Sequence, residues 1–385
     1  MTGSQSRRAA VVGVAESDLG VVGPDRTGLQ LQAQAAQRAL CEAGLGLRDV
    51  DGIFTAGGES SMPSCALAEY LGISPRWSDT TSIGGASFES HVGHATVAIA
   101  RGECEVALIS YGSVQRSSGG RTLGRLGAVH GPAQFESIWG LPLPVGAYAL
   151  AAMRHMHLYG TTSEQLAQVA VAARQWAHLN EKAYRRDLLT TADVLASPMV
   201  STPLHRLDCC LVTDGGGAVV VTNEAVARQT NRRPVWIAGH AEAHTHHTIS
   251  NMPDLTVTPA ALSGPRAMAM AGVTHADIDI VEIYDSFTIT VLLTLEGLGF
   301  CQPGEAGDFV TRRGIGPGGD FPLNTNGGGL SYCHPGMYGI FLLIEATRQL
   351  RGECGVRQVE GARLALVHGT GGVLSSGATV VLSSD

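Results

Sequence analysis

The sequence Asn324-Thr-Asn-Gly-Gly-Gly-Leu-Ser-Tyr-Cys-His-Pro-Gly-Met-Tyr-Gly339 places three consecutive glycines, two tyrosines, a cysteine, a histidine and a proline within sixteen residues, and an apolar segment follows it. Glycine lets the backbone approach a ligand closely, and the His-Pro-Gly turn predicts a tight loop that leads into the N-terminus of a helix. Loops of this composition carry chemistry more often than packing. A single motif is weak evidence, however, and an ordinary strand-to-helix turn with an exposed histidine explains the same residues equally well.

The segments on either side of this loop alternate between short apolar runs and longer amphipathic runs. We expect strands at residues 9–14, 50–54, 106–110, 235–239, 278–284, 364–368 and 378–382, and helices at residues 27–43, 87–100, 145–159, 163–180, 258–272, 287–299 and 334–350. The two halves repeat one order of elements, which predicts an α/β protein with parallel sheets wrapped by helices and a duplicated αβα core. The expected halves are residues 1–225, with an insertion at about 113–203 over one face, and residues 226–385.

The charge and composition of the chain exclude several classes of protein. The net charge is −8 and the arginines occur as isolated pairs, so we expect no nucleic-acid partner. No apolar run has the length of a membrane span, and the first residues lack the apolar core of a secretion signal, which predicts a cytoplasmic protein with no membrane partner. The eight cysteines form no CxxC pair, which argues against a zinc ribbon or a redox dithiol.

The chain contains a single lysine, Lys182, in the polar segment Asn180-Glu-Lys-Ala-Tyr184. Imine chemistry requires a lysine whose pKa is lowered by removal from water. A lysine in this polar context is expected to be solvated, so the sequence argues against a Schiff-base enzyme.

Four segments together resemble the thiolase superfamily, and most closely its sterol-carrier-protein-type or lipid-transfer-protein branch. They are Ile83-Gly-Gly-Ala-Ser-Phe-Glu-Ser-His-Val-Gly-His-Ala95, Arg206-Leu-Asp-Cys-Cys-Leu-Val-Thr-Asp-Gly-Gly-Gly-Ala218, Glu282-Ile-Tyr-Asp-Ser-Phe-Thr288 and Asn326-Gly-Gly-Gly-Leu-Ser-Tyr-Cys-His-Pro-Gly336. These segments follow one another in the family's order and cover nearly the whole chain. The resemblance implies the thiolase fold, which is a duplicated, five-layered αβαβα core with an inserted loop domain.

The departures from the family pattern decide which chemistry the resemblance implies. Thiolases acylate a cysteine at the start of a buried helix, and Gly85 stands at that position. Gly369 stands near the position of their second cysteine, and Tyr284 replaces the polarising asparagine of their Asn-Glu-Ala-Phe motif. Only the histidine of their Gly-His-Pro loop is retained, as His334. The family's thiolysis reaction is therefore not expected here.

A site with one histidine and one tyrosine but no nucleophile is suited to proton transfer. A retro-aldol cleavage of a 3-hydroxyacyl thioester needs a base for the hydroxyl proton and donors for the enolate. The lipid-transfer-protein branch contains aldolases of this kind, which carry Tyr-Asp where thiolases carry Asn-Glu. We therefore expect a retro-aldolase that acts on a 3-hydroxyacyl-CoA with a steroid or other branched acyl group, with Tyr284 and His334 as its acid–base residues. The sequence does not order these roles, although an unperturbed histidine, with a pKa of about 6.5, is a better base than a tyrosine of about 10.

Further residues are candidates for support of the reaction or for substrate binding. The candidates for support are Asp285, Cys333, Tyr332, Tyr338 and Ser87, and the candidates for substrate contact are Gly328, Gly329, Gly371, Gly372 and His244. Coenzyme A is expected as part of the substrate, and no cofactor is expected to bind tightly. The resemblance also implies a homodimer and, as in some family members, a small OB-fold partner subunit in a heterotetramer.

Simpler roles compete with these assignments. Tyr284 ends an apolar run and fits an ordinary tyrosine at the edge of the core. Asp285 is better suited to capping the next helix. Cys209 and Cys210 precede a buried strand and fit packing. Histidines 240, 244, 246 and 247 form a metal-like cluster, but their crowding favours a surface loop, so no metal is expected.

Two other classes of function stay open. The chain can be a non-catalytic subunit that binds acyl-CoA or lipid, or an acyltransferase with a relocated nucleophile. Ser87 and Cys333 are the nearby nucleophiles that the sequence offers for the second class. The presence of both Tyr284 and His334 favours catalysis over a scaffold.

Overall fold

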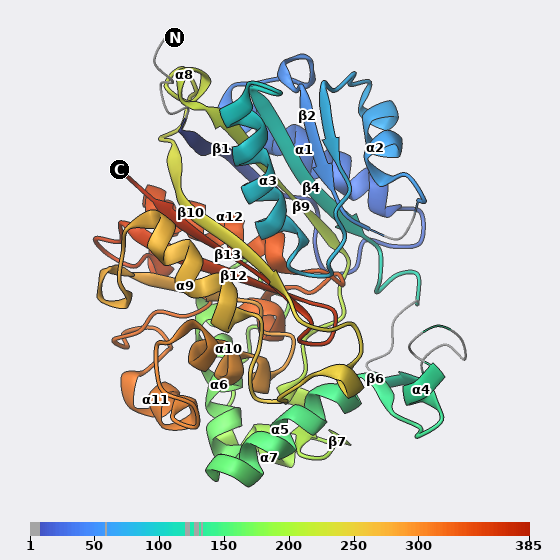
Figure 1. The fold of residues 1–385 in the computed structure, drawn as a ribbon, viewed down its shortest axis with the longest axis vertical. Coiled ribbons are helices and arrows are strands. Elements are labelled where there is room, and N and C mark those ends of the chain that lie inside the picture. The colour runs from blue at the N-terminus through green and yellow to red at the C-terminus, as the bar shows by residue number, and fades with distance from the viewer. Residues whose placement is uncertain (1–7, 58–59, 120–123, 127–130, 132–133) are drawn as a thin grey trace.

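The structure of the protein is a computed structural model that describes residues 8–57, 60–119, 124–126, 131 and 134–385 (Figure 1). Its main strands are β1 (Ala9–Glu16), β2 (Gly52–Thr55), β3 (Trp77–Asp79), β4 (Val106–Ser113), β9 (Gly215–Asn223), β10 (Val235–His244), β11 (Ile280–Ile283), β12 (Leu364–Gly371) and β13 (Ser376–Ser383). These strands form one sheet in the order β11-β12-β13-β10-β1-β9-β4-β2-β3. The pairing of β1 with β10 joins the two halves of the chain.

The sheet is mixed, and the expectation of parallel sheets was wrong. The pairs β2–β3, β2–β4 and β11–β12 are parallel. The pairs β1–β9, β4–β9, β10–β13 and β12–β13 are antiparallel. The physical reason is clearest at β12 and β13, because the few residues between Gly371 and Ser376 can join only antiparallel neighbours.

The main helices form three further layers around the two halves of the sheet. They are α1 (Gly28–Ala43), α2 (Pro63–Leu71), α3 (Ser87–Arg101), α9 (Ala260–Ala271), α10 (Thr288–Leu298) and α12 (Gly339–Arg351). Helices α1 and α2 pack on the outer side of the N-terminal strands, and α9, with α10 behind it, covers the C-terminal strands. Helices α3 and α12 lie between the halves and contact strands of both (Figure 1). This arrangement is the expected duplicated, five-layered core.

The sequence accounts for the ends of the helices well. Helix α1 begins after a capping box formed by Thr27 and Gln30 and ends at Gly44, which adopts a left-handed conformation with φ of 75°. Helix α12 is an exception, because it begins at Gly339 and not at His334 as expected. The five residues before Gly339 form an irregular loop, and that loop carries the histidine.

The insertion expected at about 113–203 contains several short elements and two long helices. They are β5 (Gly124–Leu126), α4 (Gln134–Ser137), β6 (Pro142–Pro144), α5 (Val145–Tyr159), α6 (Ser163–Leu179), α7 (Thr191–Ala196) and β7 (Met199–Ser201), and β8 (Leu204–His205) follows. Both long helices were expected, and α6 begins after a capping box formed by Thr162 and Gln165. Helices α5, α6 and α7 gather at one end of the molecule (Figure 1). Two further short α-helices are α8 (Glu224–Ala227) and α11 (Ala306–Arg313). The division of the chain at residue 225 stays a prediction.

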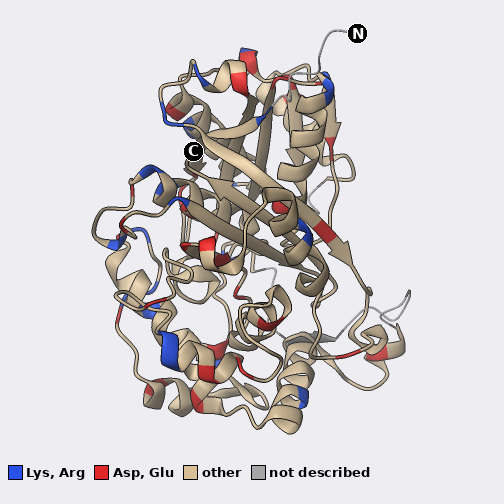
Figure 2. Ribbon diagram, turned by 60° about the vertical axis from the view of Figure 1, so that its left-hand side comes forward, with Lys and Arg blue, Asp and Glu red and all other residues tan. Residues whose placement is uncertain are grey.

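Positively and negatively charged residues are interspersed along the outer helices and loops (Figure 2). The side chain of Lys182 is 58% exposed, and its Nζ lies 3.0 Å from Oε2 of Glu16. This exposure confirms that the lysine is solvated. None of the helices in the described part of the chain is long and apolar enough to cross a membrane.

Candidate active site

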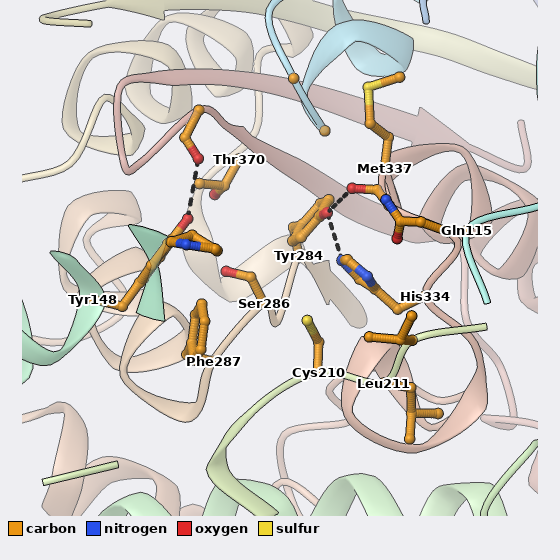
Figure 3. Close-up of a pocket in the computed structure, with 16 residues that line it drawn as sticks. Gln115, Tyr148, Cys210, Leu211, Tyr284, Ser286, Phe287, His334, Met337 and Thr370 are labelled. Carbon is orange, nitrogen blue, oxygen red and sulfur yellow. Dashed lines mark hydrogen bonds between the residues drawn. The ribbon is translucent and has the colours of Figure 1, made fainter. Parts of the chain in front are cut away.

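A cavity of about 220 Å³, here called the reaction cavity, lies between the two halves of the fold. Its walls include Gly84 and Gly85 before α3, Tyr284 after β11, His334 in the loop before α12, and Thr370 of β12. Figure 3 shows the side chains of Tyr284 and His334 pointing toward each other from separate segments. The structure therefore brings together the two residues that the sequence analysis selected as acid and base.

Tyr284 and His334 form a buried hydrogen-bonded pair. The phenol oxygen of Tyr284 lies 2.8 Å from Nε2 of His334 and 3.4 Å from the carbonyl oxygen of Gly336. The residues are only 5% and 3% exposed. The backbone N–H of His334 donates to Oγ1 of Thr213 at 2.9 Å, and its carbonyl accepts from the N–H of Thr213. These bonds hold the loop, and therefore the imidazole, in place.

Tyr338 supports this pair as a packing partner. Its ring meets the ring of Tyr284 edge-to-face at 5.7 Å and stacks on His334 at 6.3 Å. Its hydroxyl donates to Oδ1 of Asn326 at 2.8 Å. Burial raises the pKa of Tyr338 well above its usual range. The phenol therefore stays protonated, and we assign it to positioning and not to proton transfer.

Asp285 does not cap the following helix, so that expectation was wrong. Its buried carboxylate accepts hydrogen bonds from the backbone N–H groups of Gly329, at 2.6 Å, and Leu330, at 3.2 Å. A Cβ atom on Gly328 would overlap this carboxylate. The absence of side chains at Gly328 and Gly329 leaves room for the carboxylate of Asp285. Neither glycine lines the reaction cavity. Their packing against Asp285 shapes the histidine loop, and their expected contact with substrate stays a prediction.

Gly85 leaves the space that the ring of Tyr284 occupies. A Cβ atom on Gly85 would overlap Cε2 of Tyr284 and would lie 2.6 Å from the carbonyl oxygen of Thr370. A side chain at position 85 and the ring of Tyr284 therefore exclude each other.

The space beside Gly369 is likewise occupied by another side chain, that of Glu89. A Cβ atom there would overlap Oε2 of Glu89 on α3, and one on Gly339 would lie 2.6 Å from Oε1 of Glu89. Glu89 is 1% exposed, and neither of its oxygens has a hydrogen-bond partner in the described part of the chain. Burial raises the pKa of Glu89 from the ordinary value of 4.5 to about 8. The carboxyl group is therefore protonated at neutral pH.

Glu89 makes the stability of the fold depend on pH. Because its pKa is raised on folding, its contribution to stability is complete below pH 4.5 and is lost as the pH rises from 4.5 to about 8. Each unit of pKa shift corresponds to about 1.36 kcal/mol, so the free energy of unfolding falls by at most about 5 kcal/mol over this range. We expect Glu89→Gln to remove this part of the pH dependence, measured as the free energy of urea unfolding at pH 5, 6.5 and 8. The control is Glu103→Gln, at an exposed residue just after the end of α3. This variant should keep the wild-type dependence of unfolding free energy on pH. An unchanged slope in Glu89→Gln would contradict the assignment.

Three other candidates lie outside the reaction cavity. The hydroxyl of Ser87 donates to the carbonyl of Gly84 at 2.6 Å and closes the first turn of its own helix. Cys333 is fully buried, and burial raises its thiol pKa well above the usual range. Tyr332 donates to Glu16, which also pairs with Arg348. None of these three side chains lines the reaction cavity, and their support roles stay predictions.

A second cavity of about 450 Å³, here called the histidine cavity, adjoins the reaction cavity and shares Gly84 and Gly372 with it. His244, His246 and His247 contribute to its walls. Gly372 and His244 are therefore placed where a substrate can reach them, whereas Gly371 packs against the backbone of residue 83. No group of three or more histidine, cysteine, aspartate or glutamate side chains in the described residues is arranged to hold a metal ion.

Several residues that line the reaction cavity were not predicted from the sequence. Cys210 was interpreted as packing, but it lies in the wall with Ser286, Gln115 and Tyr148 (Figure 3). The packing interpretation fits its neighbour Cys209, whose thiol pKa is raised by burial. Two adjacent cysteines in a loop have no helical or strand periodicity that predicts which of them faces a cavity. Only the tertiary structure shows that Cys210 lines the reaction cavity and Cys209 does not.

The fold and the site define a thiolase-like protein whose nucleophile is replaced by glycine. Residues 241–384 match the family model described as "Thiolase C-terminal domain-like". The chain is 37% identical to the 17-hydroxy-3-oxo-4-pregnene-20-carboxyl-CoA lyase of Mycobacterium tuberculosis, over 97% of this chain and 98% of that protein. It is 32% identical to an acetyl-CoA acetyltransferase of Methanothermobacter thermautotrophicus, over 98% of this chain and 100% of that protein. The chain belongs to the thiolase superfamily.

A solved structure supports both the fold and the branch. The Ltp2-ChsH2(DUF35) aldolase superimposes with a TM-score of 0.89 and 32% identity, covering 98% of this chain and 97% of that chain. The predicted thiolase fold and family are thereby confirmed. The relatives include both a lyase and an acyltransferase, so the site itself must discriminate between those reactions.

Proposed function

We propose that this chain is a thiolase-fold carbon–carbon lyase that cleaves a 3-hydroxyacyl-CoA by a retro-aldol reaction. The observation that carries the proposal is the buried pair of Tyr284 and His334, joined at 2.8 Å in a cavity where Gly85 stands in place of a nucleophile. The names of the lyase relative and of the aldolase structure support the same class of reaction. A non-catalytic subunit would have no need for a buried acid–base pair at a cavity wall.

The pair can move the two protons that the reaction requires. The hydroxyl of Tyr284 takes the proton of the substrate 3-hydroxyl group and passes its own proton to Nε2 of His334 along the 2.8 Å hydrogen bond, so that His334 holds the proton as the base. The electrons of the O–H bond form the new carbonyl, the bond between C2 and C3 breaks, and its electron pair passes into the thioester enolate. The proton held by the pair then returns to C2. Atoms and charge balance without an acyl-enzyme.

The enolate oxygen needs stabilisation, and the helix ends around the cavity supply it. Gly84 and Gly85 lie within three residues of the start of α3, and Met337 lies two residues before α12. The N-terminus of a helix carries a partial positive charge and unpaired backbone donors. Fixed donors that face a developing negative charge are a large source of rate acceleration.

We assign the CoA half of the substrate to the histidine cavity, where His244 and Gly372 lie. The acyl group is a steroid side chain or another branched chain, in line with the name of the lyase relative. The aldolase structure is named as an assembly with a DUF35 component. We propose a homodimer that binds a small OB-fold partner as a heterotetramer in the cytoplasm, with coenzyme A present only as part of the substrate.

The proposed reaction is tested by product analysis. The protein, alone and with its candidate OB-fold partner, is incubated with 3-hydroxy-3-methylbutyryl-CoA and with a branched steroid 3-hydroxyacyl-CoA. We expect a ketone and a shortened acyl-CoA in equal amounts, without any requirement for free CoA. An absence of products from both substrates, with and without the partner, would support the non-catalytic alternative instead.

Cys210 provides the test against an acyltransferase, because it is the only thiol among the described residues that line the reaction cavity. We expect Cys210→Ala to retain cleavage within about threefold, since the proton-transfer pair is untouched. Intact mass spectrometry of the wild type during turnover should show no acyl adduct. Cys333→Ala is the matched control at a buried thiol. A covalent adduct that disappears in Cys210→Ala would establish the acyltransferase.

A further inference from the structure

Glu89 is a buried carboxyl residue that takes no part in the proton transfers of the proposed reaction. It lies on α3, one turn after Gly85, and is 1% exposed. Neither of its oxygens has a hydrogen-bond partner among the residues that the structure describes. A carboxyl group without a partner is costly to bury, and an apolar side chain of similar size would fill the space at a lower cost. Packing by itself therefore does not account for this residue.

The carboxyl group of Glu89 lies where three elements of the site meet. Cβ atoms on Gly339, the first residue of α12, and on Gly369 of β12 would both overlap its Oε2. The Cβ atom on Gly339 would also overlap the backbone oxygen of Gly85, a residue that lines the reaction cavity. Glu89 therefore belongs to the first turn of α3 and packs against the start of α12 and against β12.

The charge of Glu89 matters because two helices begin at the reaction cavity. Gly85 and Met337 line the cavity, and they precede the first residues of α3 and α12 by two positions. The N-terminus of a helix carries a partial positive charge that favours an anion. A carboxylate in the first turn would offset this charge and would repel a developing enolate. A neutral carboxyl group leaves the positive ends of both helices available to the enolate.

Burial keeps Glu89 neutral at neutral pH, because it raises the pKa of this residue to about 8. The titratable residues nearest to it on the elements that pack around it are His91 on α3, Tyr338 before α12, His368 on β12 and Tyr284 after β11. Burial lowers the pKa of His91 to about 4 and that of His368 to about 3, and it raises the pKa of Tyr338 well above its usual range. These last three groups therefore keep their charge state at mildly alkaline pH, whereas Glu89 becomes charged.

We propose that Glu89 is a positioning residue for the cleavage reaction, which holds the first turns of α3 and α12 at the reaction cavity as a neutral acid and opposes the enolate as a carboxylate. The inference rests on the proposed lyase function and adds an alkaline limit to that reaction. Glu89 is not among the described residues that line the reaction cavity. It therefore acts through the two helix ends and not by contact with the substrate.

The pH dependence of cleavage separates this role from simple packing. In the wild type, kcat should fall at least about tenfold between pH 7 and pH 9.5, with a midpoint near the Glu89 pKa of about 8. Glu89→Gln keeps the size and stays neutral, so its kcat at pH 7 should lie within about threefold of the wild type and should not fall at alkaline pH. Glu89→Ala leaves the space empty and should lower kcat at every pH, while the exposed Glu103→Gln should follow the wild type. An equal alkaline fall in the wild type and in Glu89→Gln, at an unchanged folded fraction, would overturn the proposal.

Binding of an enolate mimic tests Glu89 without any cleavage. S-carboxymethyl-CoA carries a carboxylate near the position of the enolate oxygen, and S-ethyl-CoA is its matched counterpart without that charge. In calorimetric titrations of the full chain, the affinity for the first relative to the second should fall at least about tenfold from pH 7 to pH 9.5 in the wild type and stay constant in Glu89→Gln. A constant ratio in the wild type would overturn the proposal and leave the lyase function intact. The expected fall in a wild type that cleaves neither substrate would contradict the lyase function and retain the effect of Glu89 on the charge of the cavity.

Discussion

Tyr284→Phe and His334→Ala are each expected to lower kcat/KM for cleavage by about 10²- to 10⁴-fold, the usual contribution of a positioned acid or base. Phenylalanine keeps the ring that packs edge-to-face against Tyr338 at 5.7 Å and removes only the hydroxyl that meets Nε2 of His334 at 2.8 Å. The loss in Tyr284→Phe should therefore appear in kcat at an unchanged unfolding temperature.

The double variant distinguishes a pair from two independent residues. Because the two side chains share one hydrogen bond, the effects should be strongly non-additive, and the double variant should be little worse than the worse single variant. The exposed residues Tyr70 and His157, changed to phenylalanine and alanine, are the matched controls and should retain full activity. Cleavage within a few-fold of the wild type in both single variants would exclude the proposed mechanism.

Gly85→Ala is expected to lower cleavage by about 10²-fold or more, because a displacement of about 1 Å at a catalytic group has effects of that size. The added Cβ would overlap Cε2 of Tyr284 and lie 2.6 Å from the backbone oxygen of Thr370. The β12 strand cannot yield easily, so the tyrosine ring must move away from His334. The measurement is kcat/KM together with the unfolding temperature.

Gly46→Ala is the control, since a Cβ atom there meets nothing closer than 3.8 Å. For the same steric reason Gly85→Cys should not restore thiolysis, because the ring of Tyr284 occupies the space of the new thiol. A stable Gly85→Cys protein that becomes acylated would show that the ring moves readily and would refute the mutual exclusion of the two side chains.

Much of the fold and the central pair of the site could be predicted from the sequence. The two helices expected at residues 145–159 and 163–180, and the choice of Tyr284 and His334, follow from local patterns and family motifs. The direction of strand pairing could not, because the periodicity of a buried strand is the same in parallel and antiparallel sheets. The role of Asp285 was missed because its partners, the N–H groups of residues 329 and 330, are distant in sequence.

The sequence by itself determined what this protein lacks and what it keeps. Glycines at 85 and 369 remove the two thiols, and His334 remains within a loop that a motif identifies. Only the tertiary structure decided what fills the vacated space: the ring of Tyr284 at one glycine and the carboxyl group of Glu89 at the other. The tertiary structure also shows that Cys210 lines the reaction cavity, whereas Cys333 is buried outside it. The reason is physical, since residue types are local properties of the chain, whereas the occupation of a given volume depends on every segment that packs around it.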